Sequence, residues 1–192
     1  MTGSMKHASA IILACALAVP ALAQDSTNNI AAATGLPASA ELAPPIVSFA
    51  ASAGALTAPL ILTNDYIVLP GDQAELTNGG RAVFNFSVTN AGSFVIETLV
   101  NAPDESSNSF FLNIDADPVD PDMIWDVPVT AGFEKRTVSL RGNGDSSTDQ
   151  FTPKVFKLDT GTHNLIIIGR EPGTLLKSLS IHPAPADKPV SP

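Results

Sequence analysis

Between residues 46 and 182, short runs place apolar side chains at every second position, which is the period of a half-buried β-strand. The clearest run is Ala82, Phe84, Phe86 and Val88, which alternates with polar residues and is expected to place one face on a core. Similar patterns predict strands at 93–101, 110–114, 123–129, 135–140, 155–158, 164–169 and 175–181. The inward side chains expected from three of these strands are Phe110, Leu112 and Ile114; Met123, Trp125, Val127 and Val129; and Leu175, Leu179 and Ile181.

Residues typical of turns separate these strands. The sequence Arg141-Gly142-Asn143-Gly144 closes the segment 135–140, and Asp159-Thr160-Gly161 between two strands predicts a β-hairpin. No long helical period follows residue 23, and no internal repeat is evident. Short strands joined by Gly, Pro and Asp turns predict an all-β fold, a β-sandwich or jelly roll.

The two ends of the chain differ in composition from the strand-rich part. Residues 1–23 have the pattern of a signal peptide, with Lys6 and His7, an apolar run at 8–19 and the small-x-small sequence Ala21-Leu22-Ala23. That run is too short to anchor the chain across a bilayer core about 30 Å thick. We therefore divide the chain into a signal peptide 1–23, a flexible leader 24–45, a β-sandwich domain 46–182 and a Pro-rich tail 183–192. The expected location is extracellular or periplasmic, without membrane insertion.

Composition narrows the class of partner. The 192 residues suit one domain, and 44% of them are hydrophobic. The formal charge of −9 argues against nucleic acid and against an anionic membrane surface, because both attract clustered Lys and Arg. Neutral glycans, cations and basic proteins remain open. Cys15, the only cysteine, lies in the expected signal peptide, so the mature chain is expected to have no disulfide.

Sequence signatures of catalysis are absent: there is no G-x-S-x-G, H-E-x-x-H or phosphate-binding loop. His163 and His182 lie at the ends of expected strands, without metal-ligand spacing, and both are expected to be exposed. The acidic segment 115–126 lacks the Gly and closing Glu of an EF-hand, so we interpret it as an Asp-Pro turn, with a calcium site as the alternative. No cofactor and no enzymatic activity are expected, although nineteen carboxylates leave room for a hydrolase pair.

Four segments, taken in order, resemble carbohydrate-binding modules of families 6 and 35. They are 107–115 (SNSFFLNID), 125–128 (WDVP), 156–165 (FKLDTGTHNL) and 170–175 (REPGTL). The resemblance covers about residues 49–182 and implies a galactose-binding-like jelly roll of the kind found in secreted bacterial proteins. It does not fix the ligand, because one fold serves many functions.

Two positions depart from the pattern of these families. Their Glu-x-Glu pair, which helps to hold a structural calcium ion, corresponds here to the segment 50–54 (AASAG), and an Asp of their last strand corresponds to Lys177. Without these carboxylates the calcium site is expected to be lost, and no metal site is assigned in its place. Lys177 shares the parity of Leu179, so its charge is expected either to replace the ion within the core or to reach water near a strand end.

A sugar site needs an aromatic face with polar side chains beside it. The candidate ligand-binding residues are Trp125, Phe133, Asn108, Arg170, Glu171 and Tyr66. Core packing is the alternative for Trp125 and Tyr66, and structural pairing is the alternative for Arg170 with Glu171. The predicted function is a secreted, non-catalytic module for glycan or cell-surface polysaccharide. The other functions considered are a self-associating subunit of a matrix, adhesion or filament, and a carboxylate-based hydrolase.

Overall fold

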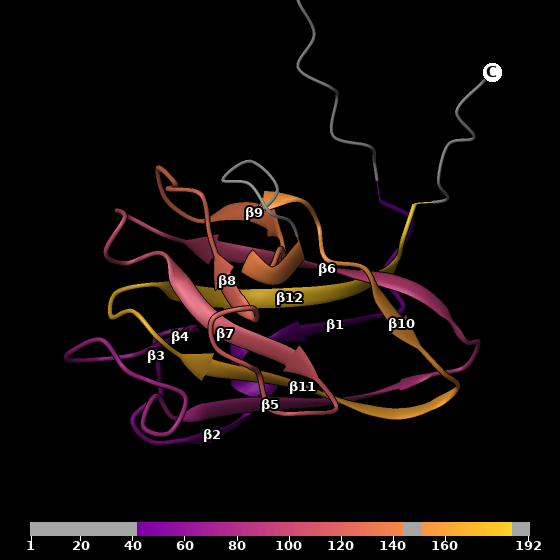
Figure 1. Cartoon of the computed structure of the whole chain (residues 1–192), viewed down its shortest axis with the longest axis horizontal. Coiled ribbons are helices and arrows are strands. Elements are labelled where there is room, and N and C mark those ends of the chain that lie inside the picture. Colours follow the sequence, from indigo (N-terminus) through magenta and orange to yellow (C-terminus); the bar gives the residue numbers. More distant parts are fainter. Residues whose placement is uncertain (1–41, 144–150, 186–192) are drawn as a thin grey trace, which may run out of the picture. The chain divides into compact units, whose positions relative to one another are not determined.

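The computed structural model describes residues 42–143 and 151–185, which form two antiparallel β-sheets packed face to face (Figure 1). The predicted signal peptide, and most of the predicted leader and tail, lie outside the described residues. The strands are β1 (Val47–Ala50), β2 (Ala55–Thr57), β3 (Ile61–Thr63), β4 (Tyr66–Val68), β5 (Arg81–Val88), β6 (Gly92–Asn101), β7 (Ser109–Ile114), β8 (Ile124–Asp126), β9 (Glu134–Thr137), β10 (Phe156–Leu158), β11 (Gly161–Gly169) and β12 (Leu175–Pro183). Single 3₁₀ turns, η1 (Ala51–Ala53) and η2 (Arg141–Asn143), follow β1 and β9.

The predicted all-β sandwich is confirmed by the sheet topology. The seven-stranded sheet has the order β10-β6-β12-β4-β3, with β1 also paired to β12 and β9 also paired to β6. The five-stranded sheet has the order β2-β5-β11-β7-β8. Within the described residues, no helix is long and apolar enough to cross a bilayer.

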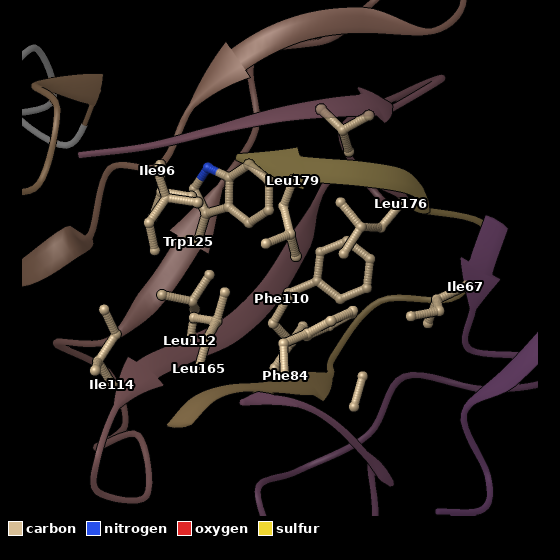
Figure 2. Packing of buried hydrophobic residues seen from close by; sticks show 14 of the residues in the cluster. Ile67, Phe84, Ile96, Phe110, Leu112, Ile114, Trp125, Leu165, Leu176 and Leu179 are labelled. Atoms are coloured by element: carbon tan, nitrogen blue, oxygen red, sulfur yellow. The ribbon is translucent and has the colours of Figure 1, made fainter. Parts of the chain in front are cut away.

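The space between the sheets is filled by the alternating apolar residues that the sequence predicts. Phe84 of β5 and Phe110 of β7 are 1% and 0% exposed, and Figure 2 shows both in the same packed layer as Leu176 of β12. The predicted inward faces of β5 and β7 are confirmed, because Ala82, Phe84, Phe86, Val88, Phe110, Leu112 and Ile114 are all buried. Burial of each large side chain contributes roughly 1.5–3 kcal/mol, so this layer is the main source of stability.

The predicted hairpin between β10 and β11 is wrong. β10 pairs with β6 in the seven-stranded sheet, whereas β11 pairs with β5 and β7 in the five-stranded sheet. The connection Asp159-Thr160 therefore crosses from one sheet to the other, and its residue types suit either kind of turn. The deciding factor lies far away in the sequence: β9 covers the edge of β6 only from Glu97 to Val100, which leaves its first residues open to β10.

The strand β8 is shorter than the predicted segment 123–129, and this changes one inward residue. Trp125 and Val127 are 0% exposed, as predicted, but Val129 is 47% exposed. The backbone N–H of Val127 still donates to the carbonyl O of Asn108 (2.7 Å). Pro128 then follows, without an N–H to continue a ladder, and the chain leaves the sheet.

A β-bulge in β12 changes which residues of the last strand face the core. The register with β6 shifts between Leu176 and Ser178, so Lys177 is an extra residue without a partner on β6. Leu176 is 0% exposed, whereas Leu175 is only half-buried. The prediction that Leu175 faces the core is therefore wrong, because simple alternation cannot anticipate an inserted residue.

Lys177 reaches the surface, which was one of its two expected behaviours. Its side chain is 38% exposed, and Nζ lies 2.6 Å from Oδ2 of Asp65. The ammonium group also lies 5.3 Å from the centre of the Phe133 ring, a distance typical of cation–π contacts. The charge is therefore compensated at the surface and does not enter the core.

The two ends of the domain leave the seven-stranded sheet side by side. Nδ1–H of His182 donates to the carbonyl O of Ala43 (2.7 Å), and the indigo start of the described chain lies beside its yellow end in Figure 1. Pro183, at the end of β12, is opposite Phe94 near the start of β6. Asn101, at the other end of β6, is opposite the first residue of β12. Both chain ends therefore emerge beside the start of β6, and the loops after β6 and before β12 lie at the opposite end.

Both histidines of the domain are buried, contrary to prediction. His163 and His182 are 8% and 7% exposed. Nδ1 of His163 lies 2.6 Å from Oδ2 of Asp115, Nε2 lies 2.9 Å from the carbonyl O of Asp159, and the ring centre is 5.5 Å from that of Phe86. His163 shares the inward parity of β11, and this outweighs its position near the strand end.

This environment predicts a pH-dependent stability. The hydrogen bond to Asp115, with a smaller contribution from the Asp159 carbonyl, raises the pKa of His163 above its usual value. A pKa raised by folding stabilises the fold fully below the unfolded value, about 6.5, and the contribution is lost as pH rises through the folded value. We expect His163→Gln to lose more unfolding free energy, relative to wild type, at about pH 5.5 than at about pH 8.5. Urea unfolding at both pH values measures this, and a difference that stays constant or grows with pH would contradict it.

Candidate functional site

A cleft of about 360 Å³, here called the loop-end cleft, opens where β6 ends and β12 begins. Its residues come from the connections that follow β6, β8, β9 and β11 and from the end of β8. The lining residues are Glu105, Asn108, Asp126, Pro128, Val129, Arg141, Phe151 and Glu171.

Two other hollows offer less varied chemistry. One of about 420 Å³ lies beside the turn between β5 and β6, near the two chain ends, and no charged side chain lines it. Another of about 430 Å³ lies beside Ile168, where the charged residues Arg81 and Asp117 are paired with each other at 2.6 Å. Neither contains an aromatic side chain with a large exposed surface. The loop-end cleft is therefore the candidate site.

One wall of the loop-end cleft is formed by a bidentate ion pair between Arg141 and Asp126. Nε of Arg141 donates to Oδ2 of Asp126 (2.5 Å), and Nη2 donates to Oδ1 (2.9 Å). Asp126 is the last residue of β8 and is 8% exposed, whereas the Arg141 side chain is 38% exposed. The hydrogen bond to Asp126 is the main cause of a raised pKa for Arg141, and the charges of Asp126, Glu171 and Asp120 add to it.

A second ion pair anchors the loop before β12. Nη1 of Arg170 donates to Oε1 of Glu171 (2.5 Å) and to the hydroxyl of Ser109 (2.6 Å). Oε2 of Glu171 accepts the backbone N–H of Asn108 (3.0 Å). The side chains of Arg170 and Glu171 are 15% and 11% exposed, so this pair is nearly desolvated. Structural pairing, the alternative considered from the sequence, describes the contacts of these two residues.

Asn108 is held by its backbone, which leaves its side chain available to a ligand. Its N–H donates to Glu171, and its carbonyl O accepts from Val127 (2.7 Å). Its side-chain amide forms no hydrogen bond with the described part of the chain and lines the loop-end cleft. A side-chain amide offers two donors and one acceptor, which suits recognition of hydroxyl groups.

The apolar rim of the loop-end cleft contains an aromatic residue that the sequence analysis missed. Phe151 is 43% exposed, and Val129 beside the cleft is 47% exposed. A signal for Phe151 was present in the sequence, because it follows a polar run, DSSTDQ, and precedes Thr152-Pro153 without any apolar alternation. An isolated aromatic residue in a polar loop has no core to fill and is available for binding.

The three aromatic candidates from the sequence do not line the loop-end cleft. Trp125 is 0% exposed and its ring centre lies 6.0 Å from that of Phe110, inside the layer shown in Figure 2. A ring without exposed surface has no face to offer a sugar. Tyr66 and Phe133 lie 5.8 Å apart, inclined at 44°, in a separate surface cluster where Lys177 covers the Phe133 ring. Of the six candidates, Asn108 and Glu171 line the loop-end cleft, and Arg170 is paired with Glu171 without being one of its lining residues.

The acids of the segment 115–126 are distributed among separate partners. Asp115 binds His163, Asp117 binds Arg81 and Asp126 binds Arg141. Across residues 42–143 and 151–185, no three His, Cys, Asp or Glu side chains lie close enough together to hold a metal ion. The described side chains therefore do not provide the several oxygen ligands that calcium needs.

Family 35 carbohydrate-binding modules are among the solved structures that this one resembles. A native family 35 carbohydrate-binding module from Clostridium thermocellum matches 74% of this chain and 100% of its own, at 14% identity and a TM-score of 0.52. The chain has the fold of a family 35 carbohydrate-binding module. The resemblance seen in the sequence is thereby confirmed at the level of the fold.

Other structures share this family 35 fold. A second structure of a family 35 module from Clostridium thermocellum matches 71% of this chain and 98% of its own, at 14% identity and a TM-score of 0.50. The GH26-CBM35 β-(1,4)-mannanase of Podospora anserina matches 74% of this chain but only 28% of its own, at 12% identity and a TM-score of 0.50. No protein-family model matches the sequence, and no curated protein sequence matches it. Because one fold carries many functions, the function has to be argued from the loop-end cleft.

Proposed function

We propose that the protein is an exported binding module that holds a glycan in the loop-end cleft and catalyses no reaction. The observation that carries this proposal is the combination, in one cleft, of the exposed Phe151 ring with the uncommitted amide of Asn108. The solved structures with the same fold are named as carbohydrate-binding modules of family 35, and this supports the proposal. Export rests on the signal-peptide pattern of residues 1–23.

The residues of the loop-end cleft suit the amphipathic surface of a sugar. An aromatic ring packs against the apolar C–H face of a sugar, and a few placed polar groups orient its hydroxyls. Phe151 supplies the ring, Asn108 supplies donors and an acceptor, and the exposed part of Arg141 supplies a further donor. A volume of about 360 Å³ is near the small end of ligand sites, roughly 300–1,000 Å³, and therefore suits a short stretch of glycan.

The carboxylates of the loop-end cleft support binding without catalysis. A glycosidase needs one carboxyl group that donates a proton and one carboxylate that attacks or activates water. Both oxygens of Asp126 accept from Arg141, and the oxygens of Glu171 accept from Arg170 and from the backbone N–H of Asn108. Neither of these two carboxylates is free to transfer a proton. Glu105, the exposed acid that lines the same cleft, does not by itself make the pair that a glycosidase needs, so the hydrolase is the weakest of the functions considered.

We expect Phe151→Ala to weaken glycan binding by about fivefold or more, because aromatic anchors are enriched among the residues whose truncation costs more than about 1 kcal/mol. A glycan array with the purified protein first identifies a bound glycan, and isothermal titration calorimetry then compares the variants. Phe133→Ala is the matched control, since it removes the same ring from the separate surface cluster. Equal affinity of Phe151→Ala and wild type for the bound glycan would remove the loop-end cleft as the site.

An assembly subunit is the second candidate, and a specific observation favours it. β3 is an edge strand of the seven-stranded sheet, and its neighbouring residues Ile61 and Leu62 are 43% and 40% exposed. An edge strand with exposed apolar side chains is a template for pairing with another chain. Size-exclusion chromatography with light scattering distinguishes the two functions: a large oligomer that binds no glycan would favour assembly.

A further inference from the structure

Among the described residues at the loop-end cleft, the negative charges outnumber the positive charges. Asp126 pairs with Arg141, and Glu171 pairs with Arg170, so each guanidinium is matched by one carboxylate. Glu105 lines the same cleft, is exposed, and forms no ion pair or hydrogen bond with the part of the chain that the structure describes. After the two ion pairs are formed, the cleft therefore keeps one uncompensated carboxylate.

Asp120 adds to this excess of negative charge. It is exposed, and it lies close enough to Arg141 for its charge to contribute to the raised pKa of that guanidinium. Glu105, Asp126 and Glu171 line the cleft, and Asp120 acts on Arg141, which is the basic residue among the described lining residues, whereas Arg170 contributes through its pair with Glu171. The formal charge of the whole chain, −9, has the same sign. Such a field concentrates positive ligands and repels negative ones.

We propose that the glycan held in the loop-end cleft carries free amino groups, one of which pairs, as an ammonium group, with Glu105. This inference rests on the proposed function and names the chemical class of its ligand. Phe151 contacts the apolar face of the sugar, Asn108 contacts its hydroxyls, and Glu105 selects for the charge. All three side chains line the same cleft, so one ligand can contact them together.

The charged side chains of the cleft disfavour two other kinds of charged ligand, uronic acids and metal ions. The carboxylate of a uronic acid would have to compete for Arg141 with Asp126, which already accepts from Nε and Nη2. It would also place a second carboxylate beside Glu105. A metal ion would need several oxygen ligands, and no suitable group of acids exists among the described residues. An ammonium group needs one carboxylate and can complete its hydrogen bonds with water.

The test compares glycans that carry positive, neutral or negative groups, and it separates charge from shape with the Glu105→Gln variant and with salt. The binding of β-1,4-linked tetrasaccharides of glucosamine and of N-acetylglucosamine, and of an oligogalacturonate, is measured by calorimetry with the purified protein in low salt. A parallel array covers other neutral glycans, and a chelator is present in one series. The variants are Glu105→Gln, which keeps the shape of the side chain, and Glu75→Gln, an exposed glutamate outside the cleft.

We expect the glucosamine tetrasaccharide to bind about fivefold more tightly than its N-acetylated form, which is the upper range for one exposed ion pair. The preference is expected to disappear in Glu105→Gln and in about 1 M salt, and to persist in Glu75→Gln and with the chelator. If neutral or acidic glycans bind as tightly as the amino form, the inference is wrong while the proposed function stands. If no glycan in any series binds, the proposed function itself is wrong.

Discussion

Replacing Trp125 by alanine is expected to lower the free energy of unfolding by about 4 kcal/mol, the usual cost of removing a large buried aromatic side chain. Trp125 is 0% exposed and packs beside Phe110 within the layer between the sheets. Its removal leaves a cavity that the rigid strands of both sheets cannot close. Urea unfolding monitored by circular dichroism measures the loss as a lower midpoint at an unchanged slope.

Trp125→Phe is the matched control for this prediction. The indole Nε1 is buried and has no hydrogen-bond partner within the described structure, so phenylalanine removes an unsatisfied donor while it keeps most of the ring. We expect Trp125→Phe to lose only about 1 kcal/mol and to bind glycan as the wild type does. If Trp125→Ala keeps full stability and loses glycan binding, Trp125 is a contact residue and its assignment to the core is wrong.

Replacing Glu171 by alanine is expected to lower the free energy of unfolding by about 3 kcal/mol, because breaking a buried ion pair leaves the charge of Arg170 buried without its partner. Glu171 binds Arg170 and the backbone of Asn108, and both charged side chains are at least 85% buried, with exposed fractions of 15% and 11%. Its loss would leave Arg170 with the Ser109 hydroxyl as its hydrogen-bond partner. Because Asn108 lines the loop-end cleft, glycan affinity is expected to fall with stability.

Glu97→Ala is the control for Glu171→Ala. Glu97 pairs with Lys135 at 2.7 Å, but the lysine side chain is 75% exposed. Exposed ion pairs contribute about 0.2–1 kcal/mol, so this variant is expected to remain close to wild type. Equal losses for the two variants would mean that burial does not strengthen the Glu171 pair. Intact binding in a destabilised Glu171→Ala variant would mean that this residue does not position Asn108.

The sequence predicts the fold well wherever the alternation of apolar residues is uninterrupted. β5 is the best case, since Ala82, Phe84, Phe86 and Val88 all face the core. Each apolar residue of such a strand indicates the same inward face, so the prediction does not depend on any single position. The inward parity of β11 also explains the burial of His163, although its place near the strand end suggested exposure.

The failures arise where a distant part of the chain decides the local structure. The bulge at Lys177 appears in the pairing of β12 with β6, which no pattern within β12 alone can specify. The turn Asp159-Thr160 joins two sheets because the edge of β6 is open to β10. Turn chemistry describes how a chain reverses, but the partner of each strand depends on which edges are free.

The candidate site was only partly predictable for a similar reason. Asn108 and Glu171, which line the loop-end cleft, are among the candidates from the sequence because polar side chains beside turns have local explanations that can be weighed. Trp125 was misleading, because a lone tryptophan fills a core as well as it contacts a sugar. Phe151 was missed because its neighbours in the cleft lie at least ten positions away in the sequence. Its role depends on the fold more than on its surroundings in the chain.

The placement of both ends of the described domain, Ala43 and Pro183, beside the start of β6 determines how the domain can be immobilised. β6 has ten residues, so the loop-end cleft lies about 30 Å from those ends, at about 3.3 Å for each residue. A sensor surface or a fused reporter attached beside Ala43 or beside Pro183 therefore leaves the cleft pointing toward solution. Attachment through either end presents the same face, which makes the domain suited to use as an oriented probe.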